Sequence, residues 1–151
     1  TQQRVQMSNK EFPFDERIAS GFIKAPIGAG GGITEFLGFE ITDASPGVMV
    51  GQFEVREDLL TPMGNMHGGV LSAFCDHMLG CVCYPAMKKG QWAATTEFKI
   101  NLTAPVTKGV VEARAEIVNL SRTQAVVRID VRNEDRLAAT AQGTVTIRDP
   151  R

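Results

Sequence analysis

One apolar stretch contains the residues whose types and spacing could do chemistry. Residues 64–87 read GNMHGGVLSAFCDHMLGCVCYPAM and contain no Lys, Arg or Glu, so that Asp76 is their only carboxylate. A helix that is apolar on nearly every side is a buried helix, and a buried Asp needs a partner or a use. Asp76 is therefore either tied into the structure or serves as a nucleophile or general base.

The glycine pair Gly68-Gly69 at the expected start of this helix favours the chemical interpretation. The first N–H groups of a helix have no acceptor within the helix and carry the positive end of its dipole. Small residues there let a carbonyl oxygen approach the Gly68 N–H, which would polarise the carbonyl and hold the oxyanion formed on attack. Gly68 and Asp76 lie roughly 12 Å apart along one helix. We therefore expect a homodimer in which Asp76 of one chain lies near Gly68 of the other.

Several of these residues also have a structural interpretation. Asp76 could hydrogen-bond a neighbour in the dimer, and His67 could pack at the helix start instead of acting as a general acid. His77 follows Asp76 and points to a different side of the helix, which indicates a structural role. Met63, Met66 and Met78 could line an acyl pocket or fill the core.

The segments around the helix alternate polar and apolar residues with period two, as strands do. Such runs begin near Leu37 and Met49 before a helix expected over residues 67–86, and near Trp92, Val111, Ala125 and Leu137 after it. The short turns between the last four runs indicate antiparallel pairing. The sequence thus predicts an α+β fold in which one curved antiparallel sheet wraps one long central helix.

The strand expected after the helix carries two adjacent threonines. Strict alternation places Ala94, Thr96 and Phe98 on one face, and Thr95 and Glu97 on the other. The two hydroxyl groups are therefore expected on opposite faces of the sheet.

The chain divides into an N-terminal extension, residues 1–34, and one domain, residues 35–151. The extension contains a short helix expected within residues 13–24 and a glycine-rich hinge at residues 28–32. This glycine run lacks the Lys-Ser/Thr pair of a phosphate-binding loop, so nucleotide binding there is not expected.

Composition narrows the class of protein. The 151 residues suffice for one domain with a real core, and 43% hydrophobic with 22% charged residues is ordinary for a globular protein. A net charge of −1 gives no basic surface for nucleic acid. The apolar helix carries Asp76 and His77, which makes it a poor membrane span. The odd set Cys75, Cys81 and Cys83 indicates reduced thiols and a cytoplasmic location, and no metal site or organic cofactor is implied.

The string HGGVLSAFCD at residues 67–76, with Gly64 three residues before His67, resembles the hotdog-fold acyl-CoA thioesterases of the phenylacetic-acid-degradation (PaaI-like) type. Their pattern is G-x-x-H-G-G followed by a helix that bears Asp or Glu. The resemblance covers about residues 35–148. It implies a hotdog fold and hydrolysis of an acyl-CoA thioester to the free acid and CoA. It also implies a homodimer, which in this family commonly assembles into a dimer of dimers.

The resemblance also implies roles for single residues. Gly68 donates its N–H to the thioester carbonyl, and Asp76 is the nucleophile or the base. Thr95 best matches the Ser or Thr that assists the attacking water, and Thr96 is the second match. A Gly-Arg or Gly-Lys pair of the family that touches the CoA phosphates corresponds to Ser121-Arg122.

The remaining substrate contacts implied by the resemblance lie around the helix start. They are His67, Gly69, Asn65 and Thr61, of which Thr61 stands six residues before His67, where many relatives carry Asn or Gln. Two other functions stay open on the same fold: a non-catalytic acyl-CoA binding or sensing protein, and a hydratase or dehydratase of acyl thioesters. The identity of the acyl group, and acyl carrier protein in place of CoA, stay open as well.

Overall fold

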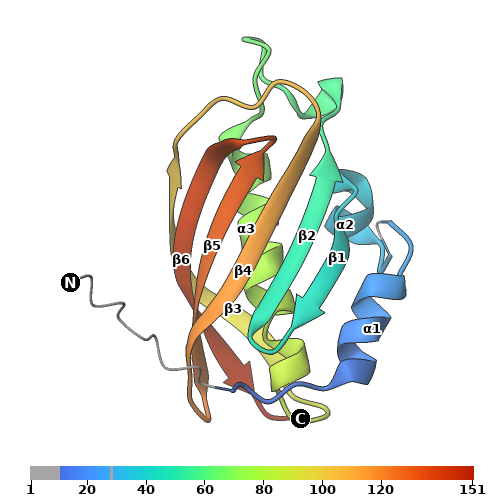
Figure 1. The fold of residues 1–151 in the computed structure, drawn as a ribbon, viewed down its shortest axis with the longest axis vertical. Coiled ribbons are helices and arrows are strands. Elements are labelled where there is room, and N and C mark those ends of the chain that lie inside the picture. Colours follow the sequence, from blue (N-terminus) through green and yellow to red (C-terminus); the bar gives the residue numbers. More distant parts are fainter. Residues whose placement is uncertain (1–10, 28) are drawn as a thin grey trace, which may run out of the picture.

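The computed structural model describes residues 11–27 and 29–151, and its centre is a six-stranded antiparallel sheet beside one long helix. The strands are β1 (Glu40–Ser45), β2 (Val48–Glu54), β3 (Trp92–Leu102), β4 (Val110–Leu120), β5 (Gln124–Asn133) and β6 (Arg136–Arg148), and the long helix is α3 (Gly68–Cys81). Figure 1 shows α3 behind the curved sheet, with two shorter helices beside the β1 edge. The predicted α+β architecture is confirmed.

The order of strands in the sheet is β1-β2-β4-β5-β6-β3. Short turns do pair β4 with β5 and β5 with β6, as predicted. The prediction is wrong for β3 and β4, because β3 pairs with β6 at the far side of the sheet. The connection over residues 103–109 therefore crosses from one edge of the sheet to its interior. Within the described part of the chain, β3 is an edge strand with one side unpaired.

The central helix is shorter than the expected span of residues 67–86. His67 is its N-cap and Val82 its C-cap, and the chain then forms a short 3₁₀ helix, η2 (Tyr84–Ala86). Pro85 explains this ending, because proline has no N–H to continue the helical hydrogen bonds. Among the described residues, no helix has the length and hydropathy needed to cross a membrane.

The two sides of α3 differ in burial, which corrects the expectation of a helix buried all round. Phe74, Cys75 and Met78 are fully buried against the sheet. Met78 packs so closely on Gly51 of β2 that a methyl group there would lie 2.7 Å from its sulfur. Asp76, by contrast, is exposed in the single protomer. One face of α3 is thus part of the core, and the opposite face is open.

The N-terminal segment forms two helices that pack beside the sheet. Helix α1 (Glu16–Lys24) confirms the helix expected within residues 13–24, and the Asp15 carboxylate caps it by accepting the backbone N–H groups of Arg17 and Ile18. Helix α2 (Gly32–Leu37) begins within the expected glycine hinge. The strand expected from Leu37 starts later, at Glu40, because Leu37 closes α2. The first ten residues of the predicted extension, and Gly28 of the hinge, lie outside the described residues.

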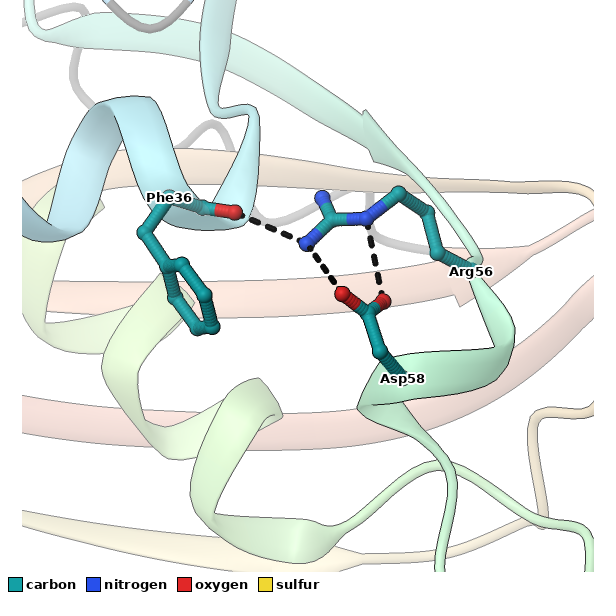
Figure 2. Close-up of polar contacts among 3 residues, drawn as sticks. All are labelled: Phe36, Arg56 and Asp58. Carbon is teal, nitrogen blue, oxygen red and sulfur yellow. Dashed lines mark hydrogen bonds and ion pairs between the residues drawn. The ribbon is translucent and has the colours of Figure 1, made fainter.

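Arg56, which follows β2, fixes the end of α2. Its guanidinium donates to the Phe36 carbonyl oxygen at 2.8 Å and pairs with the Asp58 carboxylate at 3.1 Å, as Figure 2 shows. The last carbonyl groups of a helix have no N–H donor within the helix, and an Arg side chain there can supply one. Helix α2 also runs across the predicted boundary at residue 34, and the division of the chain at that residue stays a prediction.

Candidate active site

Asp76 lies in an open groove of about 930 Å³ between the exposed face of α3 and strand β3. The helix contributes Gly69, Ser72 and Ala73 beside the carboxylate, and the strand contributes Thr95 and Thr96 opposite. Small side chains next to Asp76 leave space for another molecule to approach it. The structure thus brings the predicted acid, Asp76, together with Gly69 and both predicted threonines.

A β-bulge in β3 decides which threonine faces the helix. Thr95 pairs with Val145 of β6, whereas Glu97 pairs with the adjacent Thr144, so Thr96 is the extra residue. The bulge reverses the alternation before it, so the predicted faces are wrong for the first half of the strand. Thr95 shares a face with the buried Val145, towards α3, and the Thr96 hydroxyl is hydrogen-bonded to the Thr146 hydroxyl on the other face. Thr95 is therefore better placed than Thr96 to act on a molecule in the groove.

Gly143 makes room for the bulge. A methyl group at Gly143 of β6 would lie 2.5 Å from both the Glu97 carbonyl oxygen and Phe98 Cβ. Glycine inside a strand commonly marks a bulge or a close backbone approach. Gly143 therefore permits the local bend that turns Thr95 towards α3.

The backbone at the start of α3 leaves one donor available. His67 Nδ1 accepts the Gly69 N–H at 2.9 Å, and the His67 carbonyl accepts the Val70 N–H at 2.9 Å. No acceptor for the Gly68 N–H occurs in the described ranges. The His67 ring is thus a helix cap, and Gly68 presents the free N–H at the positive end of the helix.

A second pocket, of about 390 Å³, surrounds Gly68. Thr61, Asn65, His67 and Leu102 line it. Thr61 and Asn65 close a tight loop, with the Thr61 N–H donating to the Asn65 carbonyl at 2.7 Å. Leu102 explains why residue 68 is glycine, because a methyl group at Gly68 would lie 2.6 Å from Leu102 Cδ1.

The predicted site residues therefore fall into three places in one protomer. Asp76, Gly69, Thr95 and Thr96 line the groove, and Gly68, His67, Thr61 and Asn65 line the pocket at the helix start. Ser121 and Arg122 lie in the turn between β4 and β5 and line neither cavity. The Ser121 hydroxyl closes its own turn by accepting the Gln124 N–H at 3.1 Å.

His77 also lines the groove, although the sequence indicated only a structural role for it. Adjacent residues on a helix differ by about 100° in direction, so both Asp76 and His77 can border one wide groove. Burial lowers the pKa of His77, and the charge of Asp76 opposes that shift only in part. In the sequence, the only signal for His77 is its position next to Asp76. That position does not tell whether the side chain lines the groove or packs in the core.

Comparison with known proteins agrees with this geometry. The family model described as "Thioesterase superfamily" matches residues 63–140, slightly more than half of the chain. The 1,4-dihydroxy-2-naphthoyl-CoA hydrolase of Listeria monocytogenes is 26% identical over 121 residues, which are 80% of this chain and 98% of the relative.

Solved structures give the same result for the fold. A thioesterase from Haemophilus influenzae superposes with a TM-score of 0.76 at 26% identity, covering 80% of this chain and 85% of that one. A mutant of the phenylacetic acid degradation protein PaaI from Thermus thermophilus superposes with a TM-score of 0.68 at 35% identity, covering 74% and 95%. The matched residues include α3, the start of the helix and the strands that face it, so this chain belongs to the thioesterase superfamily and is a hotdog-fold thioesterase of the PaaI-like type.

Proposed function

We propose that the protein hydrolyses an acyl-CoA thioester to the free acid and CoA. The Gly68 N–H polarises the thioester carbonyl, and the Asp76 carboxylate acts on it as general base or nucleophile. In the first route Asp76 takes a proton from water, the hydroxide adds to the carbonyl carbon, the C–S bond breaks and the CoA sulfur takes up the proton. In the second route a carboxylate oxygen displaces CoA, and water then cleaves the mixed anhydride.

The observation that supports this proposal most strongly is the start of α3. His67 occupies the Gly69 and Val70 N–H groups and leaves that of Gly68 for a ligand. A donor fixed by the backbone needs no rearrangement when negative charge develops on the carbonyl oxygen. We assign Thr95, which lines the groove with Asp76, the role of holding the attacking water.

The separate positions of Gly68 and Asp76 support a homodimer with shared sites. In one protomer the two residues line different cavities. Strand β3 is a long edge strand whose unpaired side can add a second copy of itself. Antiparallel pairing there would set the open faces of two α3 helices side by side and bring Asp76 of one chain to Gly68 of the other. A dimer of two such dimers is part of the same proposal.

Other parts of the proposal concern CoA and its contacts. The Listeria relative is named for a CoA thioester, which favours CoA over acyl carrier protein as the carrier. Arg122 is exposed in its turn and can contact the CoA phosphates from the partner chain or from its own. We place the protein in the cytoplasm, where its three free cysteines remain reduced.

The role of the Gly68 N–H can be tested with a proline. Residue 68 is the first of the helix, where proline is tolerated, and His67 has φ −64° and ψ 130°, which suit a residue before proline. Gly68→Pro removes the N–H, whereas the control Gly68→Ala keeps it and meets Leu102 equally. We expect kcat for phenylacetyl-, hydroxybenzoyl- and straight-chain acyl-CoAs to be roughly a hundredfold lower for proline than for alanine. Equal rates for the two variants would remove Gly68 from the mechanism.

The shared site can be tested by mixing two inactive chains. A heterodimer of Asp76→Asn and Gly68→Pro chains has one site in which both groups are intact, if each site draws on two chains. Coexpression should then restore about a quarter of the wild-type rate, because half of the dimers are mixed and each holds one intact site. If both groups act within one chain, the mixture stays inactive and the dimer proposal is wrong. Tight binding of acyl-CoA without turnover by the wild type would instead indicate a binding protein.

A further inference from the structure

His77 borders two cavities at once. One is the groove beside Asp76. The other is a small cavity of about 70 Å³ between the N-terminal segment and β1, lined among others by Phe22, Thr34, Phe39 and Ile41. The imidazole of His77 therefore stands between the groove and a small, partly open cavity that the proposed reaction does not use.

The ring of His77 is held firmly in this position. Its centroid lies 5.3 Å from that of Phe39, with 38° between the ring planes. Its Nε2 lies 3.5 Å from the Cys81 sulfur, one turn further along α3. Phe39 is itself buried and packs on the rings of Phe53 and Phe74. The imidazole thus has a fixed support on the side of the small cavity.

The groove has two ends along α3. Towards the end of α3 it is lined by uncharged groups, Gly80, Cys81, Tyr84 and Ala93. Towards the start of α3 it is lined by Gly69 and Ser72, and the Asp76 carboxylate lies between the two ends. An uncharged lining suits an acyl group better than it suits the charged phosphates of CoA. A thioester whose carbonyl lies at Asp76 therefore directs its acyl group towards Tyr84 and past His77. Burial lowers the pKa of His77, so the imidazole that meets this group is neutral.

We propose that His77 is the end wall of the acyl site and a specificity-determining residue that limits the length of the acyl group. The inference rests on the function proposed above. Behind the wall, 70 Å³ is about the volume that two water molecules occupy in the liquid, which is room for about two methylene groups. The native enzyme therefore prefers compact acyl groups, and loss of the imidazole joins the two spaces.

The test compares two substitutions of one side chain. His77→Ala removes the wall, and His77→Phe keeps a ring of similar size that can still stack on Phe39. Each variant is assayed with straight-chain acyl-CoAs that lengthen in steps of two carbons. We expect His77→Ala to raise the ratio of kcat/KM for longer over shorter chains at least about tenfold, the factor for burying two more methylenes. His77→Phe should keep the wild-type length limit.

A second substitution tests whether the extra space is the small cavity. Thr34 of α2 is half-buried in the cavity wall, and its side chain takes part in no hydrogen bond within the described segments. Thr34→Leu should reverse the gain when it is added to His77→Ala, because leucine fills the space that the longer acyl group would enter. Alone, behind an intact imidazole, Thr34→Leu should leave the chain-length profile unchanged.

The outcomes separate this inference from the proposed function. S-alkyl-CoA thioethers have no carbonyl to hydrolyse. Their dissociation constants should show the same length limit in the wild type and the same loss of that limit in His77→Ala. If the wild type hydrolyses acyl-CoAs and the length profile of His77→Ala is unchanged, His77 is not the wall, although the thioesterase assignment stands. If thioethers bind with the predicted limit but no ester is hydrolysed, the wall is supported and the proposed function fails. His77→Asn, smaller and still polar, replaces the alanine variant where thermal unfolding shows that alanine prevents folding.

Discussion

The two faces of α3 differ so strongly that adjacent residues on the helix have contrasting environments. Cys75 is fully buried against the sheet, and Asp76, the next residue, is exposed on the groove. The buried face is made of large apolar side chains such as Phe74 and Met78. The open face is made of small residues around one carboxylate, such as Ala73.

This contrast shows how one helix can carry both stability and chemistry. Tight packing on one side fixes the position of the helix, because interiors are close-packed and adapt only partly to a lost group. Small side chains on the other side leave the carboxylate accessible to a ligand or a second chain. Substitutions on the buried face should therefore change the free energy of unfolding, and substitutions on the open face should change turnover.

The largest effect is expected from truncation of the buried face. Phe74 is fully buried, with its ring centroid 4.8 Å from that of Phe39 and 4.9 Å from that of Phe53. Phe74→Ala should lower the free energy of unfolding by about 3–5 kcal/mol, through lost burial and the cavity left behind. Urea denaturation of the variant and of Ala73→Ser, a control on the open face, measures the difference. If both variants lost similar amounts of unfolding free energy, the two faces of α3 would not differ in their contribution to stability.

The open face should show the opposite behaviour. Asp76→Asn keeps the size of the side chain and removes its charge and basicity. We expect kcat to fall at least about a hundredfold, or about 2.7 kcal/mol in the activation free energy, with the free energy of unfolding changed by less than about 0.5 kcal/mol. Steady-state release of free thiol and urea denaturation are measured on one preparation. A variant that loses its fold would show instead that Asp76 is a structural acid.

A smaller effect, specific to the buried face, is expected at alkaline pH. Burial raises the pKa of Cys75 to about 12, with a smaller contribution from Asp76, against an ordinary value of 9.0. Above pH 9 the unfolded chain releases this proton and the folded chain keeps it, so the free energy of unfolding falls as pH rises, by about 1.4 kcal/mol per pH unit for each such thiol. Between pH 9 and 11 the free energy of unfolding should therefore fall less steeply with pH for Cys75→Ala than for the wild type, by up to about 1.4 kcal/mol per pH unit. An unchanged slope would contradict the burial of the thiol.

The smallest effect is expected away from both faces. Arg56 and Asp58 form an ion pair whose side chains are 39% and 59% exposed, and exposed pairs contribute about 0–1 kcal/mol. Arg56→Met should therefore cost no more than about 1 kcal/mol of unfolding free energy, with the loss of the Phe36 carbonyl contact included. Asp58→Asn serves as the comparison, because it weakens the pair but leaves that contact. A loss above 2 kcal/mol for Arg56→Met would mean that α2 is essential to the core.

The fold could be predicted from the sequence because its signals are local. Alternation with period two located the strands, and the apolar run with its glycine start located α3. The pairing of β3 with β6 could not be predicted in this way, because the turn lengths between consecutive strands say nothing about a connection that crosses the sheet. The start of β1 was misplaced because Leu37 fits a strand pattern and a helix end equally well.

The candidate site was predictable in its residue types and less so in its geometry. Asp76 and Gly68 stand out by composition and position in the sequence. The orientation of Thr95 depends on a bulge that Gly143 permits from another strand, and alternation within β3 carries no trace of it. The role of His77 as a shared wall depends on how α2 and β1 pack beside α3, which a pattern along one helix does not contain.

The pairing of Gly143 with the bulge has a consequence for engineering this enzyme. A library that randomises only positions around the carboxylate would leave out the residue, distant in sequence, that sets the direction of the threonine hydroxyl. Consider a chimera that takes β6 from a relative with a larger residue at position 143. That residue would collide with β3 at the bulge, and we expect the Thr95 hydroxyl to turn out of the groove even if every residue next to Asp76 is kept. Strands β3 and β6 should therefore be exchanged between relatives only as a pair.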